Sequence, residues 1–151
     1  MIQPTDRYIL FVVSGTTYAL PTAAVAYIEM IDQVTRVPNA APFIEGVVFC
    51  RGQVVPAVNL RLRFGFDRAA TDLRTRLLVV HAPGRTVGFI VDACREFLTI
   101  PAEAIAPPAD ALGSDGVHYL TGIATIGGRL VAIVNLDKLL AAVDPALTAS
   151  A

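Results

Sequence analysis

Apolar residues along the chain either alternate with polar residues or form short continuous runs, as in half-buried and buried β-strands. Short Gly-containing turns separate several of these runs, which is typical of β-hairpins. The pattern predicts strands at 8–13, 17–20, 25–31, 47–50, 53–58, 77–80, 87–91, 97–100, 123–126 and 130–134. It also predicts short helices at 60–64 and 136–143, a long irregular connection at 101–118 and a flexible tail at 144–151. The expected fold class is therefore mainly β, with short helices.

The second half of the chain repeats the first. Residues 43–60 match residues 119–136 at a constant offset of 76, with six identities, and residues 15–20 align with 84–89 at an offset of 69. Such a duplication predicts two halves, about 8–65 and 77–140, that fold alike. A half of ~65 residues buries only a thin core of its own. We therefore expect two small β-barrels, one from each half, that share a third apolar layer and leave a groove for a partner between them.

Composition favours one compact soluble domain, spanning about 7–143. Hydrophobic residues make up 54% of the 151 residues and charged residues 17%, so part of the apolar surface is expected to serve as a contact patch. No uncharged apolar run reaches the ~18 residues that membrane insertion requires, and residues 1–7 lack the pattern of a signal peptide. These features predict a cytoplasmic protein. A net charge of −1 argues against nucleic acid as a partner.

Candidate catalytic chemistry is sparse. His81 and His118 have no paired acid or nucleophile pattern, and the remaining acidic and thiol groups show no metal-ligand spacing. These groups are Asp92, Glu96, Asp110, Asp115, Cys50 and Cys94. We therefore expect no enzymatic activity, no metal and no cofactor. A docking protein is favoured, and a sensor that holds an apolar small molecule in a barrel or groove is the alternative.

Arg51 is unusual because it occupies the tip of an otherwise apolar predicted hairpin, between Phe49 and Val54. It is either a turn residue exposed to solvent or an anchor within an apolar interface, where arginine and aromatic residues are enriched. Tyr27 and Glu29 lie on one face of the strand predicted at 25–31 and could lie near it. The residue pattern leaves both interpretations open.

Four segments together resemble the CheW family of chemotaxis coupling proteins. They are DQVTRVPNAAPFIEG (32–46), RGQVVPAVNLRLRFG (51–65), VGFIVDAC (87–94) and YLTGIATIGGRLVAIVNLDKLL (119–140). The resemblance implies two SH3-like five-stranded barrels side by side and an adaptor without enzymatic activity. The implied partners are the cytoplasmic tips of chemoreceptors and the regulatory domain of a CheA-type histidine kinase, with ring assembly among CheW-like domains as a further option.

The resemblance also assigns roles to residues. Arg51 matches the arginine of the family's N-L-R-G turn, which implies a receptor-binding groove formed with Val25, Tyr27, Glu29, Phe49 and Val54. Gly46, Gly52 and Pro56, with Gly122 and Gly128 in the repeat, match structural positions of the hairpins. Three departures bear on which receptor is bound: Tyr27 replaces a glutamate for which Glu29 could substitute, Phe49-Cys50 replace Asn-Leu, and Asn59 replaces an aspartate.

Overall fold

The computed structural model describes residues 7–31, 33–107 and 119–149, which form two β-sheets with short helices. The helices are α1 (Leu60–Arg63) and α3 (Leu136–Ala149), with 3-10 turns η2 (Thr22–Ala24) and η3 (Ala102–Ala104). The strands are β1 (Arg7–Val13), β2 (Thr16–Pro21), β3 (Val25–Met30), β4 (Ile44–Cys50), β5 (Gln53–Asn59), β6 (Arg76–Ala82), β7 (Arg85–Val91), β8 (Ala93–Thr99), β9 (Ile105–Ala106), β10 (Leu120–Ile126) and β11 (Arg129–Val134). The mainly β prediction is confirmed.

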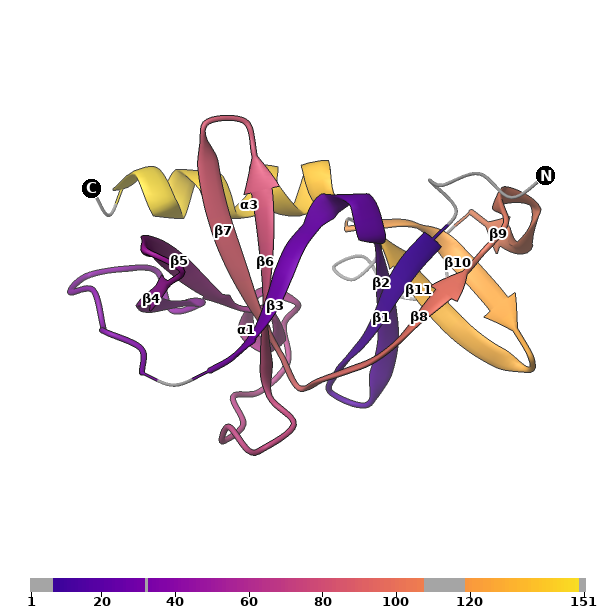
Figure 1. Cartoon of the computed structure of the whole chain (residues 1–151), viewed down its shortest axis with the longest axis horizontal. Coiled ribbons are helices and arrows are strands. Elements are labelled where there is room, and N and C mark those ends of the chain that lie inside the picture. The colour runs from indigo at the N-terminus through magenta and orange to yellow at the C-terminus, as the bar shows by residue number, and fades with distance from the viewer. Residues whose placement is uncertain (1–6, 32, 108–118, 150–151) are drawn as a thin grey trace.

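Two sheets lie side by side along the long axis of the molecule (Figure 1). One has five strands in the order β3-β6-β7-β5-β4, and the other has six in the order β8-β1-β2-β11-β10-β9. Neighbouring strands are antiparallel except β5 with β7 and β2 with β11, which pair in parallel. The sequence of pairings is thus the same in both sheets, as the internal repeat predicts.

Each sheet takes strands from both halves of the sequence. The first hairpin of the chain, β1-β2, lies in the sheet of the second half, and the first hairpin of the second half, β6-β7, lies in the sheet of the first. The expectation that each half would build its own barrel is therefore wrong. In the five-stranded sheet, β7 of the second half pairs in parallel with β5 of the first half, and in the six-stranded sheet β2 of the first half pairs in parallel with β11 of the second. The exchange thus gives hydrogen-bond partners to backbone groups that would otherwise lie at exposed strand edges.

The buried apolar side chains of the described residues form three clusters. Leu10, Ala19 and Ile133 belong to a cluster within the six-stranded sheet, and Val55 and Leu77 to one within the five-stranded sheet. The largest cluster joins the two sheets and α3, and its members include Ile9, Phe11, Leu20, Val58, Leu60, Leu78, Phe89, Val134, Leu139 and Val143. The predicted shared apolar layer is thus present. It results from strand periodicity, because successive residues such as Ile9 and Leu10 point to opposite faces and pack into different clusters.

Hydrogen bonds also join the two sheets, around Asp92 between β7 and β8. The Asp92 carboxylate accepts three hydrogen bonds from the Arg61 guanidinium, at 2.8, 2.9 and 3.1 Å, and one from the backbone N–H of Ser14 at 2.8 Å. Arg61 belongs to α1 beside the five-stranded sheet, whereas Ser14 lies in the β1-β2 turn of the six-stranded sheet. Asp92 thus helps to fix the position of one sheet against the other.

Two glycines that are equivalent in the repeat permit close approaches of the backbone. A Cβ on Gly46 would lie 2.0 Å from the Thr35 carbonyl oxygen, and one on Gly122 would lie 2.4 Å from that of Ala106. In both places a register shift in the strand brings an edge segment against the glycine. The structural roles expected for Gly46 and Gly122 follow from this contact, since no larger residue fits.

Several predicted bounds need correction. Strand β8 begins at Ala93 instead of 97, and the connection at 101–118 contains η3 and β9, while residues 108–118, with Asp110, Asp115 and His118, lie outside the described residues. The terminal helix was predicted to end at 143, with a flexible tail from 144, but α3 continues to Ala149. The helix thus includes Pro145 in its interior, where proline removes one backbone hydrogen bond and crowds the carbonyl four residues earlier, and the high helix propensity of leucine and alanine favours its continuation.

Candidate functional site

Arg51 and Gly52 form the tip of the β4-β5 hairpin, and both have positive φ angles, of 47° and 79°. Two-residue turns of this geometry match the twist of the flanking strands, but only glycine adopts them without strain. The equivalent turn of the repeat is Gly127-Gly128, which supplies glycine at both positions. Arg51 therefore occupies a position where its backbone is strained by about 1 kcal/mol relative to glycine.

The Arg51 guanidinium lies against β3, on the opposite edge of the five-stranded sheet. Its Nε donates to Glu29 Oε1 at 2.9 Å, and its Cζ lies 3.9 Å from the centroid of the Tyr27 ring. The ring face attracts the cation, and the carboxylate orients it. The expectation that Tyr27 and Glu29 lie near Arg51 is confirmed by these contacts.

An exposed apolar pair flanks the turn. Phe49 on β4 and Val54 on β5 are directly opposite in the register, and they are 75% and 65% exposed. Val25, at the start of β3, is half-buried against the cluster shared by the two sheets. All the predicted receptor-binding residues thus come from β3, β4, β5 and their connecting turn, and Val25 alone among them packs toward the second sheet.

The groups beneath Arg51 stay uncharged. Burial raises the pKa of the Tyr27 hydroxyl above its ordinary value, and it also raises the pKa of the Cys50 thiol, with a further contribution from the Glu29 carboxylate. The Tyr27 hydroxyl is buried and has no hydrogen-bond partner among the described residues. Arg51 and Glu29 are therefore the charged groups of this surface, which we call the Arg51 surface: Tyr27, Glu29, Phe49, Arg51 and Val54.

The remaining predicted hairpin residues are Gly128, at a turn, and Pro56, in the middle of β5. Gly128 has a φ of 80° at the turn that matches Gly52. Pro56 pairs with Val47 of β4, while the parallel pairing of β5 with β7 begins one residue later, at Ala57. At Pro56, β5 therefore pairs with β4 alone, so the missing N–H of the proline leaves no gap in the pairing with β7. This agrees with the expectation that proline lies at an edge, a bulge or a strand end.

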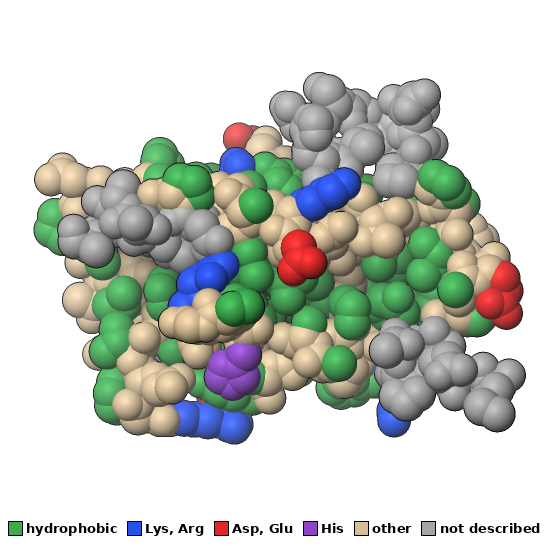
Figure 2. Space-filling model, turned by 90° about the horizontal axis from the view of Figure 1, so that it is seen from above, with side chains coloured by type: hydrophobic (Ala, Val, Ile, Leu, Met, Phe, Trp, Pro, Cys, Tyr) green, Lys and Arg blue, Asp and Glu red, His purple; other side chains and the backbone are tan. Residues whose placement is uncertain are grey.

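A related surface that the sequence analysis missed lies on the six-stranded sheet. Arg129 on β11 donates to Glu96 on β8 at 2.8 Å, and Leu130 and Phe97 beside them are 67% and 58% exposed. Leu130 is the counterpart of Val54 in the repeat. The offset of 76 could have identified it. More generally, apolar side chains reach the surface over much of the face seen in Figure 2, with charged side chains scattered among them.

Neither surface resembles a catalytic site. Among the described residues no three His, Cys, Asp or Glu side chains lie close enough to hold a metal ion. His81 Nδ1 lies 3.1 Å from the Thr86 hydroxyl, which is a structural contact within the β6-β7 hairpin. None of the helices described is long and apolar enough to cross a membrane. The Arg51 surface combines an oriented cation, an acceptor and exposed apolar area, and these groups suit contact with another protein.

Sequence and structure comparisons with known proteins point to one and the same protein family. The model of the CheW-like domain matches residues 7–144. The chemotaxis protein CheW of Klebsiella aerogenes is 33% identical over 142 residues, which cover 94% of this chain and 86% of that protein. Protein FrzA of Myxococcus xanthus is 29% identical, with 91% and 87% covered. The crystal structure of the scaffolding protein TtCheW from Thermoanaerobacter tengcongensis superposes with a TM-score of 0.79 at 26% identity, covering 87% of this chain and 89% of that one.

Proposed function

Because this chain belongs to the family of CheW-like domains, we propose that it is an adaptor that couples chemoreceptors to a CheA-type histidine kinase. It is a scaffold of chemotaxis signalling and not an enzyme, in keeping with its CheW and FrzA relatives and with the scaffolding protein whose fold it shares. The proposal assigns the Arg51 surface, with Val25 at its border, to the cytoplasmic tip of a receptor. It assigns other surfaces at the ends of the sheets to the regulatory domain of the kinase.

The conformation of Arg51 is the observation that carries this assignment. A glycine would relieve the strain at this position, as Gly127 does in the repeat. Residues in strained conformations cluster at functional sites. The Arg51 side chain is 60% exposed even while paired with Glu29, and Phe49 and Val54 beside the turn are exposed as well. A receptor helix that presents a carboxylate next to apolar residues would satisfy both features.

Coupling by such an adaptor needs binding but no chemical reaction. Simultaneous binding holds the kinase in a state that responds to the receptor, so the signal is transmitted as a coupling free energy of about 1 to 3 kcal/mol. The protein would work in the cytoplasm, recruited to receptor arrays at the inner face of the membrane, and assembly into rings with other CheW-like domains would extend the same contacts.

Capture experiments with purified components test the proposal. Immobilised chain is incubated with the cytoplasmic hairpin of a receptor and, separately, with the regulatory domain of the kinase. We expect Arg51→Ala to reduce receptor capture at least tenfold and to leave kinase capture intact. Arg129→Ala is the matched control, because Arg129 forms a similar exposed ion pair on the other sheet; it should retain receptor capture. Unchanged receptor capture by Arg51→Ala would refute the role of the Arg51 surface.

A further inference from the structure

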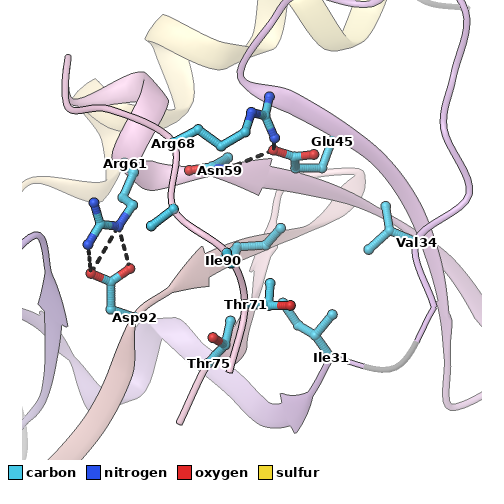
Figure 3. A pocket seen from close by; sticks show the side chains of 12 residues that line it. Ile31, Val34, Glu45, Asn59, Arg61, Arg68, Thr71, Thr75, Ile90 and Asp92 are labelled. Carbon is cyan, nitrogen blue, oxygen red and sulfur yellow. Dashed lines mark hydrogen bonds and ion pairs between the residues drawn. The ribbon is translucent and has the colours of Figure 1, made fainter. Parts of the chain in front are cut away.

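A separate pocket lies under the loop that connects α1 to β6 (Figure 3). Its volume is about 110 Å³. Ile31, Val34 and Ile90 give it an apolar wall that continues into the cluster within the five-stranded sheet. Two ion pairs, Arg61 with Asp92 and Arg68 with Glu45, line its polar side. The proposed docking role does not involve this pocket.

The first ion pair is structural. The Nε and Nη2 atoms of Arg61 bind both oxygens of Asp92, and Nη1 donates to the Asp67 carbonyl at 3.2 Å. The hydrogen bond with Asp92 raises the pKa of Arg61 above its ordinary value. Both side chains are partly buried, and Asp92 also accepts a hydrogen bond from the backbone N–H of Ser14. A ligand could not replace these contacts without disturbing the position of the two sheets.

The second ion pair is built differently. The Glu45 side chain is 14% exposed, whereas the Arg68 side chain is 51% exposed and projects from a loop without regular secondary structure. The Nη1 atom of Arg68 donates to Glu45 Oε1. The same oxygen accepts from Asn59 Nδ2 at 2.9 Å. The orientation of this amide is fixed, because Asn59 Oδ1 accepts from Leu62 N and caps α1. The Glu45 carboxylate is therefore held in place by a fixed amide, whereas the Arg68 guanidinium that binds it comes from a loop.

We propose that Glu45, Asn59 and the apolar wall form a binding site for a small organic cation of the guanidinium type, and that Arg68 occupies this site as an internal ligand. Arg68 shows which chemistry the carboxylate accepts, since its guanidinium donates to Glu45 beside the apolar wall. The volume is well below the ~300 Å³ typical of sites for drug-sized molecules. It suits a guanidinium with a short alkyl chain, whose chain would lie on Ile31, Val34 and Ile90.

Binding of such a cation displaces Arg68 and frees the loop at 66–75. The internal ligand competes with the external one, so the apparent affinity is lowered by the fraction of molecules in which Arg68 occupies the site. An ion pair with one exposed partner contributes little to stability, so its removal should strengthen binding by about fivefold at most. The competition predicts opposite effects of the two charged residues. Loss of the positive charge of Arg68 should strengthen cation binding, whereas loss of the negative charge of Glu45 should abolish it.

Titration with ethylguanidinium, followed by NMR, tests the inference on the full chain. The side-chain amide of Asn59 is the reporter, because its Nδ2 contacts Glu45. We expect saturable shifts in the wild type, a severalfold lower dissociation constant in Arg68→Ala, and no saturable shift in Glu45→Gln. Arg74→Ala is the matched control on the same loop, since Arg74 pairs with Asp72 outside the pocket. Its affinity should equal that of the wild type.

Three results would overturn the proposal. They are the absence of a saturable shift in Arg68→Ala, equal binding by Glu45→Gln, and an equal gain in affinity in Arg74→Ala, which would attribute the effect to a looser loop. Propionate serves as the charge control, and a shift of the same size with this anion would also count against the proposal. If Glu45→Gln does not fold, Glu45→Asp keeps the charge but retracts it, and it should bind ethylguanidinium more weakly than the wild type.

Discussion

Asn59 and Asn135 make the same two hydrogen bonds at equivalent positions of the repeat. The backbone N–H of Asn59 donates to the Phe43 carbonyl and that of Asn135 to the Tyr119 carbonyl, each at 2.7 Å. Their side-chain oxygens accept from the backbone N–H groups of Leu62 and Lys138, three residues further on. Each asparagine thus lies where a strand gives way to a helix, and its side chain caps the first turn of that helix.

Replacing these two residues by alanine should have different effects on stability. Asn135→Ala removes one helix cap and should lower the free energy of unfolding by about 1 kcal/mol. Asn59→Ala removes a cap and also the amide that supports the partly buried Glu45, so its effect should be about 1 kcal/mol larger. Urea denaturation of the two variants measures the difference. Equal losses would mean that the bond between Asn59 and Glu45 contributes nothing.

The strain at Arg51 predicts that two truncations of its side chain differ in stability. Arg51→Gly and Arg51→Ala both remove the contacts with Tyr27 and Glu29, but only glycine relaxes at a φ of 47°. Arg51→Gly should therefore be more stable than Arg51→Ala by about 1 kcal/mol, and both should lose receptor capture. Thermal denaturation and the capture assay give the two readouts. Equal melting temperatures would show that the turn relaxes without glycine.

Close backbone approach predicts graded effects of alanine at three glycines. Gly65→Ala should cost about 1 kcal/mol, because Gly65 has a φ of 89° but open space around it. Gly122→Ala should cost about 2 kcal/mol, because the methyl group would meet the Ala106 carbonyl oxygen and push β9 away from β10. Gly46→Ala should be the most damaging, since its methyl group would lie closest to another backbone atom. Chemical denaturation of the three variants gives the order, and a reversed order would contradict this account.

Cys94 predicts a loss of stability in alkaline solution. Burial raises the pKa of its thiol to about 11 from an ordinary value of 9.0, with a smaller opposing effect of Arg76. The folded state therefore holds this proton more tightly than the unfolded state. Its contribution to stability is complete below pH 9 and is lost as the pH rises toward 11. Cys94→Ala removes this contribution, so its free energy of unfolding should fall less steeply than that of the wild type over this range.

Thiol modification provides an independent check of the same property. In the folded protein at pH 8, Cys94 should react with a disulfide reagent much more slowly than a cysteine in the denatured chain, because the thiolate is the reactive form. Cys50→Ala leaves Cys94 as the chain's one thiol and isolates its rate. A rate equal to that of the denatured protein would show that the thiol is neither buried nor shifted.

Local features of the fold could be predicted from the sequence, because strands and hairpins depend on alternation and turn residues close together in the chain. The exchange of hairpins could not, since the pairing of β2 with β11 joins segments that share no local pattern. Strand β9 has two residues, too few for a period to be visible. The continuation of α3 past Pro145 was missed because the last residues of a sequence are commonly loosely ordered, which favoured a tail from 144.

The candidate site was only partly predictable for a similar reason. Arg51, Tyr27 and Glu29 could be grouped because a hairpin tip and a strand face are local features, and the family resemblance supported the grouping. The pocket under Arg68 could not be found in this way. Glu45, Asn59 and Arg68 come from two strands and a loop, and only the folded backbone brings them together.

The exchanged hairpins have a consequence for the origin of the molecule. Neither half contains a complete sheet, so a chain of half the length would leave strand edges unpaired. Two copies of such a chain, each lending its first hairpin to the other, would rebuild both sheets around a twofold axis. The duplicated gene product is thus equivalent to a domain-swapped homodimer whose two subunits have been joined end to end. Within one chain the two equivalent turns are free to differ, and here one is Gly127-Gly128 and the other Arg51-Gly52.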